Sequence, residues 1–138
     1  MSFYSIVPAG GIGSRLWPIS RENNPKFLLD LTDDNASLLQ QTIKRLESFS
    51  KKTYVVTGAK HALKVLEQIK ESNMSNSTSV IIEPSSKGTM GAIGIACSLI
   101  ELIDKDAVVG SFASDHAILN SYSFHEAVKE AIELAKAN

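Results

Sequence analysis

The sequence is poor in several features whose presence would narrow its function. It has one cysteine, Cys97, so an intramolecular disulfide is impossible. Cys97 lies in an apolar run, where we expect a buried structural thiol rather than a nucleophile. The longest apolar segment, residues 90–103, is interrupted by Ser98 and Glu101 and is too short to span a bilayer. The first residues lack the basic start and apolar stretch of a signal peptide, so we expect a reducing, cytoplasmic location.

An excess of charge of one sign is also absent. The 138 residues include 14 Lys and Arg against 15 Asp and Glu, for a net charge of -1. This balance gives no indication of a nucleic-acid partner or a membrane surface. The length fits one domain, and a hydrophobic content of 43% is ordinary for a soluble globular protein. An anionic ligand must therefore be held by local cations and backbone amides.

Short β-rich runs alternate with segments of helical periodicity. Buried strands are predicted at 4–8, 53–57, 79–82 and 107–111, and helices are predicted at 39–49, 62–69, 89–103 and 124–135. This order predicts a parallel sheet covered by helices on both faces. The sequence stops on a helical pattern with no strand after it, so we expect a fragment or a short version of a longer protein.

The most informative motif follows the first predicted strand. Residues 8–18 read Pro-Ala-Gly-Gly-Ile-Gly-Ser-Arg-Leu-Trp-Pro. Gly10, Gly11 and Gly13 can expose successive N–H groups to phosphate oxygens, and Arg15 adds a planar, permanently charged group. A Walker A loop would need Gly-Lys-Ser/Thr here, and the dinucleotide fingerprint would need Gly where Leu16 stands. The alternative is a glycine turn that binds nothing.

An acidic side chain follows the fourth predicted strand. The carboxyl ends of parallel strands meet at one edge, so we expect Asp115 to face the same crevice as the glycines. A carboxylate there can carry Mg²⁺, which prefers one or two carboxylates plus phosphate oxygens. The alternative is that Asp115 caps a turn. His61 and His125 lie in helical stretches, and we expect both to be ordinary surface or half-buried residues.

The glycine motif continues into residues 20–26, which read Ser-Arg-Glu-Asn-Asn-Pro-Lys. Together they resemble the signature of the sugar-1-phosphate nucleotidyltransferase family. Trp17 and the pair Ser20-Arg21 are similar to its mannose-1-phosphate guanylyltransferase branch. The resemblance implies an α/β fold, a Rossmann-like three-layer sandwich with a mainly parallel sheet of the nucleotide-diphospho-sugar transferase type, incomplete here. Residues 1–138 would form the nucleotide-binding part, and the sugar-binding part would be absent.

The resemblance also implies a reaction and roles for residues. A guanylyl group would pass from GTP to mannose 1-phosphate, giving GDP-mannose and pyrophosphate, with Mg²⁺ as cofactor. Arg15 and Lys26 would be the catalytic cations and Asp115 the metal ligand. The nucleotide would be bound by the loop residues Gly10, Gly11, Gly13 and Ser14.

The segment 83–92 is similar to the guanylyltransferase pattern Glu-Pro-x-x-(Arg/Lys)-x-Thr-x-x-Ala near the base. Glu83 can accept hydrogen bonds from the guanine N1–H and amine, although Pro84 and Ser86 also suit a capped helix start without a ligand. Phe27 stands where many guanylyltransferases have Gln, which weakens any claim about contacts from that position. Gly88 stands where Asn is commoner.

Three rival functions stay open at this point. The first is transfer of another nucleotide to another sugar phosphate, such as adenylyl or thymidylyl transfer. The second is a non-catalytic nucleotide-binding module. The third is a flavodoxin-like cofactor domain, which the Pro25-Lys26 match disfavours. Assembly into a homo-oligomer is left open, with no nucleic acid or membrane as partner.

Overall fold

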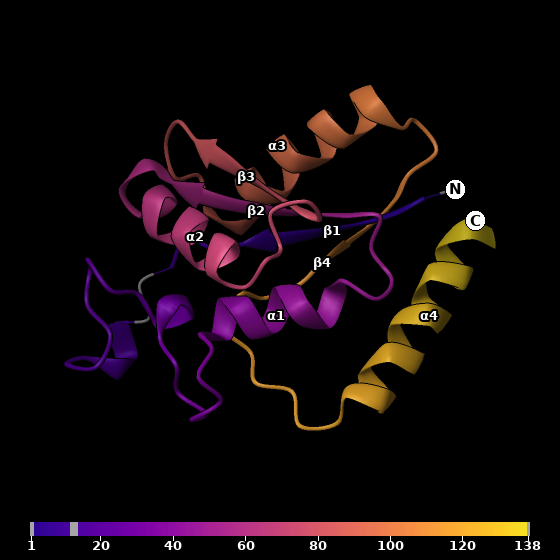
Figure 1. Cartoon of the computed structure of the whole chain (residues 1–138). Helices are drawn as coiled ribbons and strands as arrows, with labels where there is room; N and C mark the ends of the chain where they lie inside the picture. Colours follow the sequence, from indigo (N-terminus) through magenta and orange to yellow (C-terminus); the bar gives the residue numbers. More distant parts are fainter. Residues whose placement is uncertain (1, 12–13, 138) are drawn as a thin grey trace.

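A central parallel sheet organises the chain in the computed structural model, which describes residues 2–11 and 14–137 (Figure 1). The described residues form four strands in the order β3-β2-β1-β4. All three pairings are parallel, and β1 lies between β2 and β4. The strands are β1 (Phe3–Pro8), β2 (Lys52–Gly58), β3 (Thr78–Glu83) and β4 (Val108–Ser111). The predicted parallel sheet is confirmed.

Helices connect the strands in the alternating order that the sequence predicts. They are α1 (Leu38–Leu46), α2 (Ala59–Glu71), α3 (Gly88–Ile103) and α4 (Ser121–Ala137), with short 3-10 turns η1 (Ser14–Leu16) and η2 (Lys26–Leu28). Helix α1 begins with a capping box, in which Ser37 Oγ accepts from the Gln40 amide at 3.1 Å and the Gln40 side chain accepts from the Ser37 amide at 2.8 Å. Helix α1 ends before Phe49, which the periodicity had included.

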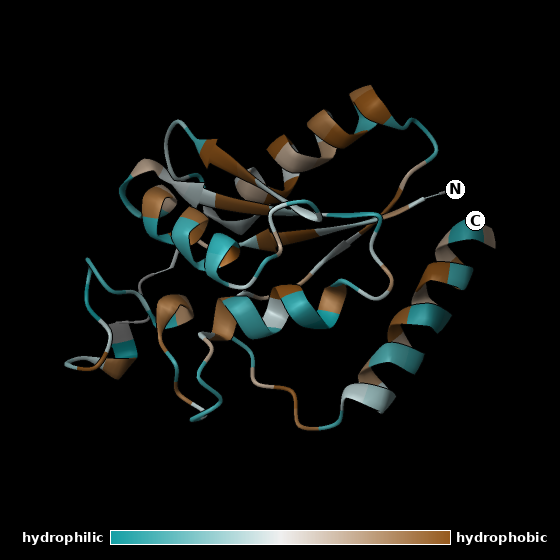
Figure 2. Ribbon diagram, in the orientation of Figure 1, coloured by the Kyte–Doolittle hydropathy of each residue, from teal (hydrophilic) through white to brown (hydrophobic). Residues whose placement is uncertain are grey.

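Alternating side chains of the inner strands build one core on each face of the sheet. Val7 and Val55 pack with α1 and α2, whereas Ile6 and Val56 pack with α3. All four side chains are fully buried. Both faces are therefore covered, as predicted, and Figure 2 shows the apolar residues on the central strands and on the sheet-facing sides of α1 and α2. Cys97 in α3 is half-buried rather than buried.

Helix α4 lies beside β4 at the edge of the sheet (Figure 1). Its Phe124 ring packs against the rings of Phe49 and Phe112, at centroid distances of 6.3 and 6.0 Å. An apolar cavity of about 350 Å³ separates much of the helix from the strand. Among the described residues, no helix combines the length and apolarity needed to cross a bilayer.

Candidate functional site

Three segments that follow strands meet at the carboxyl edge of the sheet. The glycine segment after β1 is fixed by the Ala9 amide, which donates to the Val56 carbonyl at 2.8 Å, and by Thr57 Oγ1, which donates to the Ala9 carbonyl at 2.8 Å. The segment after β4 is fixed by the Phe112 amide, which donates to the Ile6 carbonyl at 2.9 Å. The sheet's own hydrogen bonding thus continues into the loops and sets where they start.

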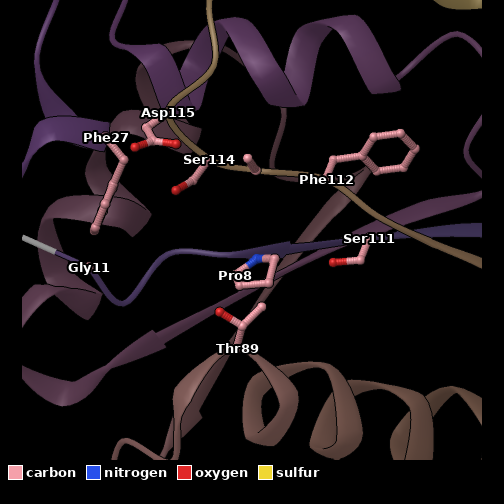
Figure 3. Close-up of a pocket in the computed structure, with 9 residues that line it drawn as sticks. Pro8, Gly11, Phe27, Thr89, Ser111, Phe112, Ser114 and Asp115 are labelled. Carbon is pink, nitrogen blue, oxygen red and sulfur yellow. The ribbon is translucent and has the colours of Figure 1, made fainter. Parts of the chain in front are cut away.

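Two adjoining cavities open at this edge. They share Pro8, Gly11 and Thr89 in their walls. The first has a volume of about 300 Å³ and extends toward Ser114 and Asp115. Figure 3 shows Thr89 at the start of α3 on one side of it and Ser114 and Asp115 on the other. The second has a volume of about 280 Å³ and is lined further by Gly10, Glu83, Ser86, Gly88 and Ala92.

Lys26 and Asp115 form an ion pair at the rim of the first cavity. Lys26 Nζ lies 3.3 Å from Asp115 Oδ2, and the two side chains are 30% and 36% exposed. They come from η2 and from the loop after β4, 89 positions apart in sequence. Within the part of the chain that the structure describes, no three His, Cys, Asp or Glu side chains are grouped to hold a metal ion. A metal bound at Asp115 would therefore take its remaining ligands from water or from a bound substrate.

Glu83 ends β3 as a buried carboxylate on the second cavity. Glu83 is 8% exposed. Its carboxylate lies close to the glycine segment, since a Cβ atom built on Gly10 would be 3.6 Å from Glu83 Oε1. Among the described residues, none forms a hydrogen bond or ion pair with the Glu83 carboxylate, whereas the Glu83 backbone is paired with β2. Lys87, the N-cap of α3, makes no side-chain capping bond, so the first amides of α3 face this region uncapped. A carboxylate acceptor and backbone donors therefore border one cavity.

The structure brings together some of the predicted site residues and leaves others apart. Gly10, Gly11, Glu83 and Asp115 line the two cavities, and Lys26 contacts Asp115. Arg15 is exposed in η1 and makes no hydrogen bond or ion pair with any described residue. Gly13 and the side chain of Ser14 lie outside the described residues.

Thr89 is a site residue that sequence reasoning did not single out. It is the second residue of α3 and borders both cavities. The Glu-Pro-x-x-(Arg/Lys)-x-Thr pattern contains this threonine, so the signal was present, but its position between the glycine segment and Asp115 depends on the tertiary fold. The sequence supports no claim about contacts from Phe27, which stands where many guanylyltransferases have Gln. In the structure its buried ring forms part of the wall of the first cavity.

Comparison with known proteins relates the chain to the nucleotidyl transferase family. A family model described as nucleotidyl transferase matches residues 4–138. Mannose-1-phosphate guanylyltransferase RfbM of Salmonella typhimurium is 40% identical over 139 aligned residues, which cover 98% of this chain and 28% of that protein. Mannose-1-phosphate guanylyltransferase 2 of Escherichia coli O157:H7 is 40% identical over 134 residues, 95% of this chain and 27% of the relative. The chain thus spans less than a third of the length of these relatives.

Solved structures share the fold. The mannose-6-phosphate isomerase of Helicobacter pylori superposes with a TM-score of 0.79 at 29% identity, over 99% of this chain and 47% of the other. HddC of Yersinia pseudotuberculosis, complexed with GMP-PN, superposes with a TM-score of 0.65 at 25% identity, over 90% of this chain and 53% of the other. These neighbours confirm the predicted three-layer fold and show that this chain contains about half of it.

Proposed function

Because this chain belongs to the nucleotidyl transferase family, we propose that it is the nucleotide-binding part of a mannose-1-phosphate guanylyltransferase. The proposal assigns nucleotide binding to residues 1–138 and leaves binding of the sugar to the additional chain that the relatives possess. The observation that carries it is the meeting of Lys26, Asp115 and the glycine segment at one edge of the sheet.

The proposed reaction needs alignment and charge neutralisation more than proton transfer. An oxygen of the mannose 1-phosphate bonds to the α-phosphorus of GTP, the bond from that phosphorus to the β-bridging oxygen breaks, and pyrophosphate leaves. The attacking phosphate is already an anion near neutral pH, so no protein base is required. Lys26, which contacts Asp115, and the amides of Gly10 and Gly11 would bind triphosphate oxygens at this edge of the sheet. Arg15 is the second proposed cation, and no ion pair within the described chain has to break before it binds phosphate.

The residues present fit Mg²⁺ as the cofactor. Mg²⁺ keeps several waters and takes one or two carboxylates together with substrate phosphate oxygens, so a single carboxylate such as Asp115 is a sufficient protein contribution. Bound there, Mg²⁺ would neutralise charge on the phosphates. Lys26, now paired with Asp115 at 3.3 Å, would then be released to the triphosphate. Gly13 and Ser14 keep their proposed contacts to the nucleotide on the strength of the motif alone.

A guanine base is proposed for the second cavity. Guanine presents N1–H and an exocyclic amine as neighbouring donors, and the Glu83 carboxylate, which has no partner in the described part of the chain, can accept both. Adenine lacks this donor pair, so the same carboxylate would disfavour ATP. The neighbouring structure named as complexed with GMP-PN supports the choice of base.

Pyrophosphate release from GTP, Mg²⁺ and mannose 1-phosphate tests the reaction, and calorimetric titration with Mg²⁺–GTP tests the binding. We expect Lys26→Ala to lower turnover by about 100- to 1000-fold, the usual effect of removing an electrostatic donor. Lys129→Ala is a matched control, because Lys129 also pairs with a carboxylate, Glu126 at 2.9 Å, but lies on α4. Binding without turnover would favour a non-catalytic nucleotide-binding module. Absence of both, or unchanged activity in Lys26→Ala, would refute the proposal.

A further inference from the structure

One face of α2 holds the segment that carries Lys26. His61 Nε2 lies 2.7 Å from the Glu22 carbonyl oxygen, Lys64 Nζ donates to the Asn23 carbonyl, and Gln68 Nε2 donates to the Leu28 carbonyl at 3.1 Å. Spacings of three and four residues put these three donors in one row along the helix. Their acceptors lie on both sides of Lys26 in the chain, so a single helix fixes the segment before and after it.

The first two acceptors belong to a tight turn. The Arg21 and Asn24 backbones exchange two hydrogen bonds, of 3.0 and 2.9 Å, which leaves the carbonyls of Glu22 and Asn23 at the tip of the turn. Pro25 and Lys26 follow at once. The position of the turn therefore sets where η2 begins, and with it the direction from which Lys26 approaches Asp115.

His61 is the buried member of the donor row. It is 6% exposed, so the expectation of an ordinary surface or half-buried histidine is wrong. A carbonyl oxygen only accepts, so the His61 Nε2 atom must carry the proton and donate. The ring also meets the Phe27 ring edge-on, with centroids 5.9 Å apart and planes at 87°. His61 thus touches the residue after Lys26 through its ring and the turn before Lys26 through its Nε2 proton.

An exposed ion pair reinforces the same turn. Lys60 Nζ lies 2.5 Å from Glu22 Oε1, and this hydrogen bond to the Lys60 ammonium lowers the pKa of Glu22. Both side chains are largely exposed, so this pair adds little by itself. Lys64, which bonds the Asn23 carbonyl, is also exposed, so the buried His61 contact is the one whose loss should loosen the turn most.

We propose that His61 is a positioning residue that holds Lys26 in place for the triphosphate, acting through the Glu22 carbonyl and the Phe27 ring. The inference rests on the proposed function for the role of Lys26. It adds a residue outside the cavities, on a helix that contributes nothing to their walls. Misplacement of a charged group by about 1 Å can cost about 100-fold in rate, so a loosened turn would be felt at the site.

Three variants test this inference. His61→Leu keeps apolar contact with Phe27 and removes the donor, whereas His61→Gln restores an N–H donor at a similar reach. His125→Leu is the matched control, because His125 Nε2 also donates to a backbone carbonyl, that of Arg45 at 3.1 Å, and its ring meets Phe49 edge-on at 5.4 Å. His125 lies on α4, away from Lys26.

The measurements are Mg²⁺–GTP affinity by calorimetry and amide hydrogen exchange across residues 21–28. We expect His61→Leu to weaken affinity by about tenfold and to raise exchange in this segment, with His61→Gln close to wild type and His125→Leu unchanged at the site. In a Lys26→Ala background, His61→Leu should have little further effect on affinity, because it acts through Lys26.

The possible results separate the two proposals. Three results would each overturn the positioning role. The first is an equal loss of Mg²⁺–GTP affinity from His61→Leu in the wild-type and Lys26→Ala backgrounds. The others are an equal loss of affinity from His61→Gln and His61→Leu, and unchanged amide exchange at 21–28 in His61→Leu. If wild type binds no Mg²⁺–GTP, the proposed function fails. The exchange comparison still decides in that case whether His61 fixes the segment around Lys26.

Discussion

Replacing Asp115 by Asn should change GTP affinity in opposite directions with and without Mg²⁺. The substitution keeps the shape of the side chain and removes its charge. Lys26 Nζ is 3.3 Å from Asp115 Oδ2 in the ligand-free protein, so the carboxylate occupies the lysine and also repels a free triphosphate. Without metal, Asp115→Asn should therefore strengthen GTP binding. With Mg²⁺, it should weaken binding, because the proposed metal ligand is gone.

The sizes of both effects follow from the exposure of the pair. The side chains are 30% and 36% exposed, and such pairs contribute about 0.2–1 kcal/mol. Releasing Lys26 should thus raise metal-free affinity by up to about fivefold, since 1.4 kcal/mol corresponds to about tenfold. The free energy of unfolding should change by less than about 1 kcal/mol. In Mg²⁺ the loss should be at least about tenfold, which is typical of removing even an indirect metal contact.

Calorimetric titrations with GTP, one in excess Mg²⁺ and one in EDTA, measure the predicted fall and the predicted rise in GTP affinity on the same variant. Trp17 is the single tryptophan, 73% exposed beside the glycine segment, and its fluorescence gives a second reading. Asp106→Asn makes the same charge change in the turn before β4, at the other end of that strand from Asp115. A change of the same sign under both conditions, or an equal effect from Asp106→Asn, would refute the reasoning.

Three further predictions concern neighbouring positions. Gly11→Ala should lower nucleotide affinity while leaving the melting temperature unchanged, because a Cβ at Gly11 meets no atom of the described residues within 4 Å and any loss must come from the ligand. Glu83→Gln should weaken GTP binding by about 10- to 100-fold, since hydrogen bonds to charged groups contribute about 1.5–3 kcal/mol. Parallel titrations should also show a smaller ratio of GTP affinity to ATP affinity than in wild type. Gly110→Ala should destabilise the fold by roughly 1–3 kcal/mol in denaturant unfolding, because its Cβ would lie 2.7 Å from the Phe3 ring and 2.9 Å from the Phe112 ring. Equal affinities of the wild type for ATP and GTP would contradict the Glu83 prediction. An unchanged free energy of unfolding in Gly110→Ala would contradict the Gly110 prediction.

Much of the fold follows from local pattern. Runs such as Val55-Val56 are apolar on both faces of the sheet, which identifies strands buried between two layers of helices. That reasoning predicts both ends of every strand to within one residue. The parallel order then puts the residues after β1, β3 and β4 at one edge. The end of α1 was less predictable, because Phe49 continues the apolar spacing but packs from the segment after the helix.

The finer arrangement of the site could not be predicted from the residues. The family resemblance assigns Lys26 and Asp115 to one site, but their direct ion pair joins a 3-10 turn and a loop that only the tertiary fold brings into contact. The contact of His61 could not be predicted from its partner, because the acceptor is the backbone carbonyl of Glu22 and every residue has such a carbonyl. Arg15 shows the reverse case, since the motif predicts a phosphate contact but the side chain is exposed and unattached within the described chain.

Amide chemical shifts followed during a Mg²⁺–GTP titration test the central claim most directly, because they locate a ligand whether or not the chain turns over. The largest changes should fall on Gly10, Gly11, Thr89, Ser114 and Asp115, which border the two cavities. At the same nucleotide concentrations, these changes should be smaller when Lys26 is replaced by Ala. Changes concentrated at the opposite edge of the sheet or along α4, or no saturable change at all, would contradict a triphosphate site at this edge.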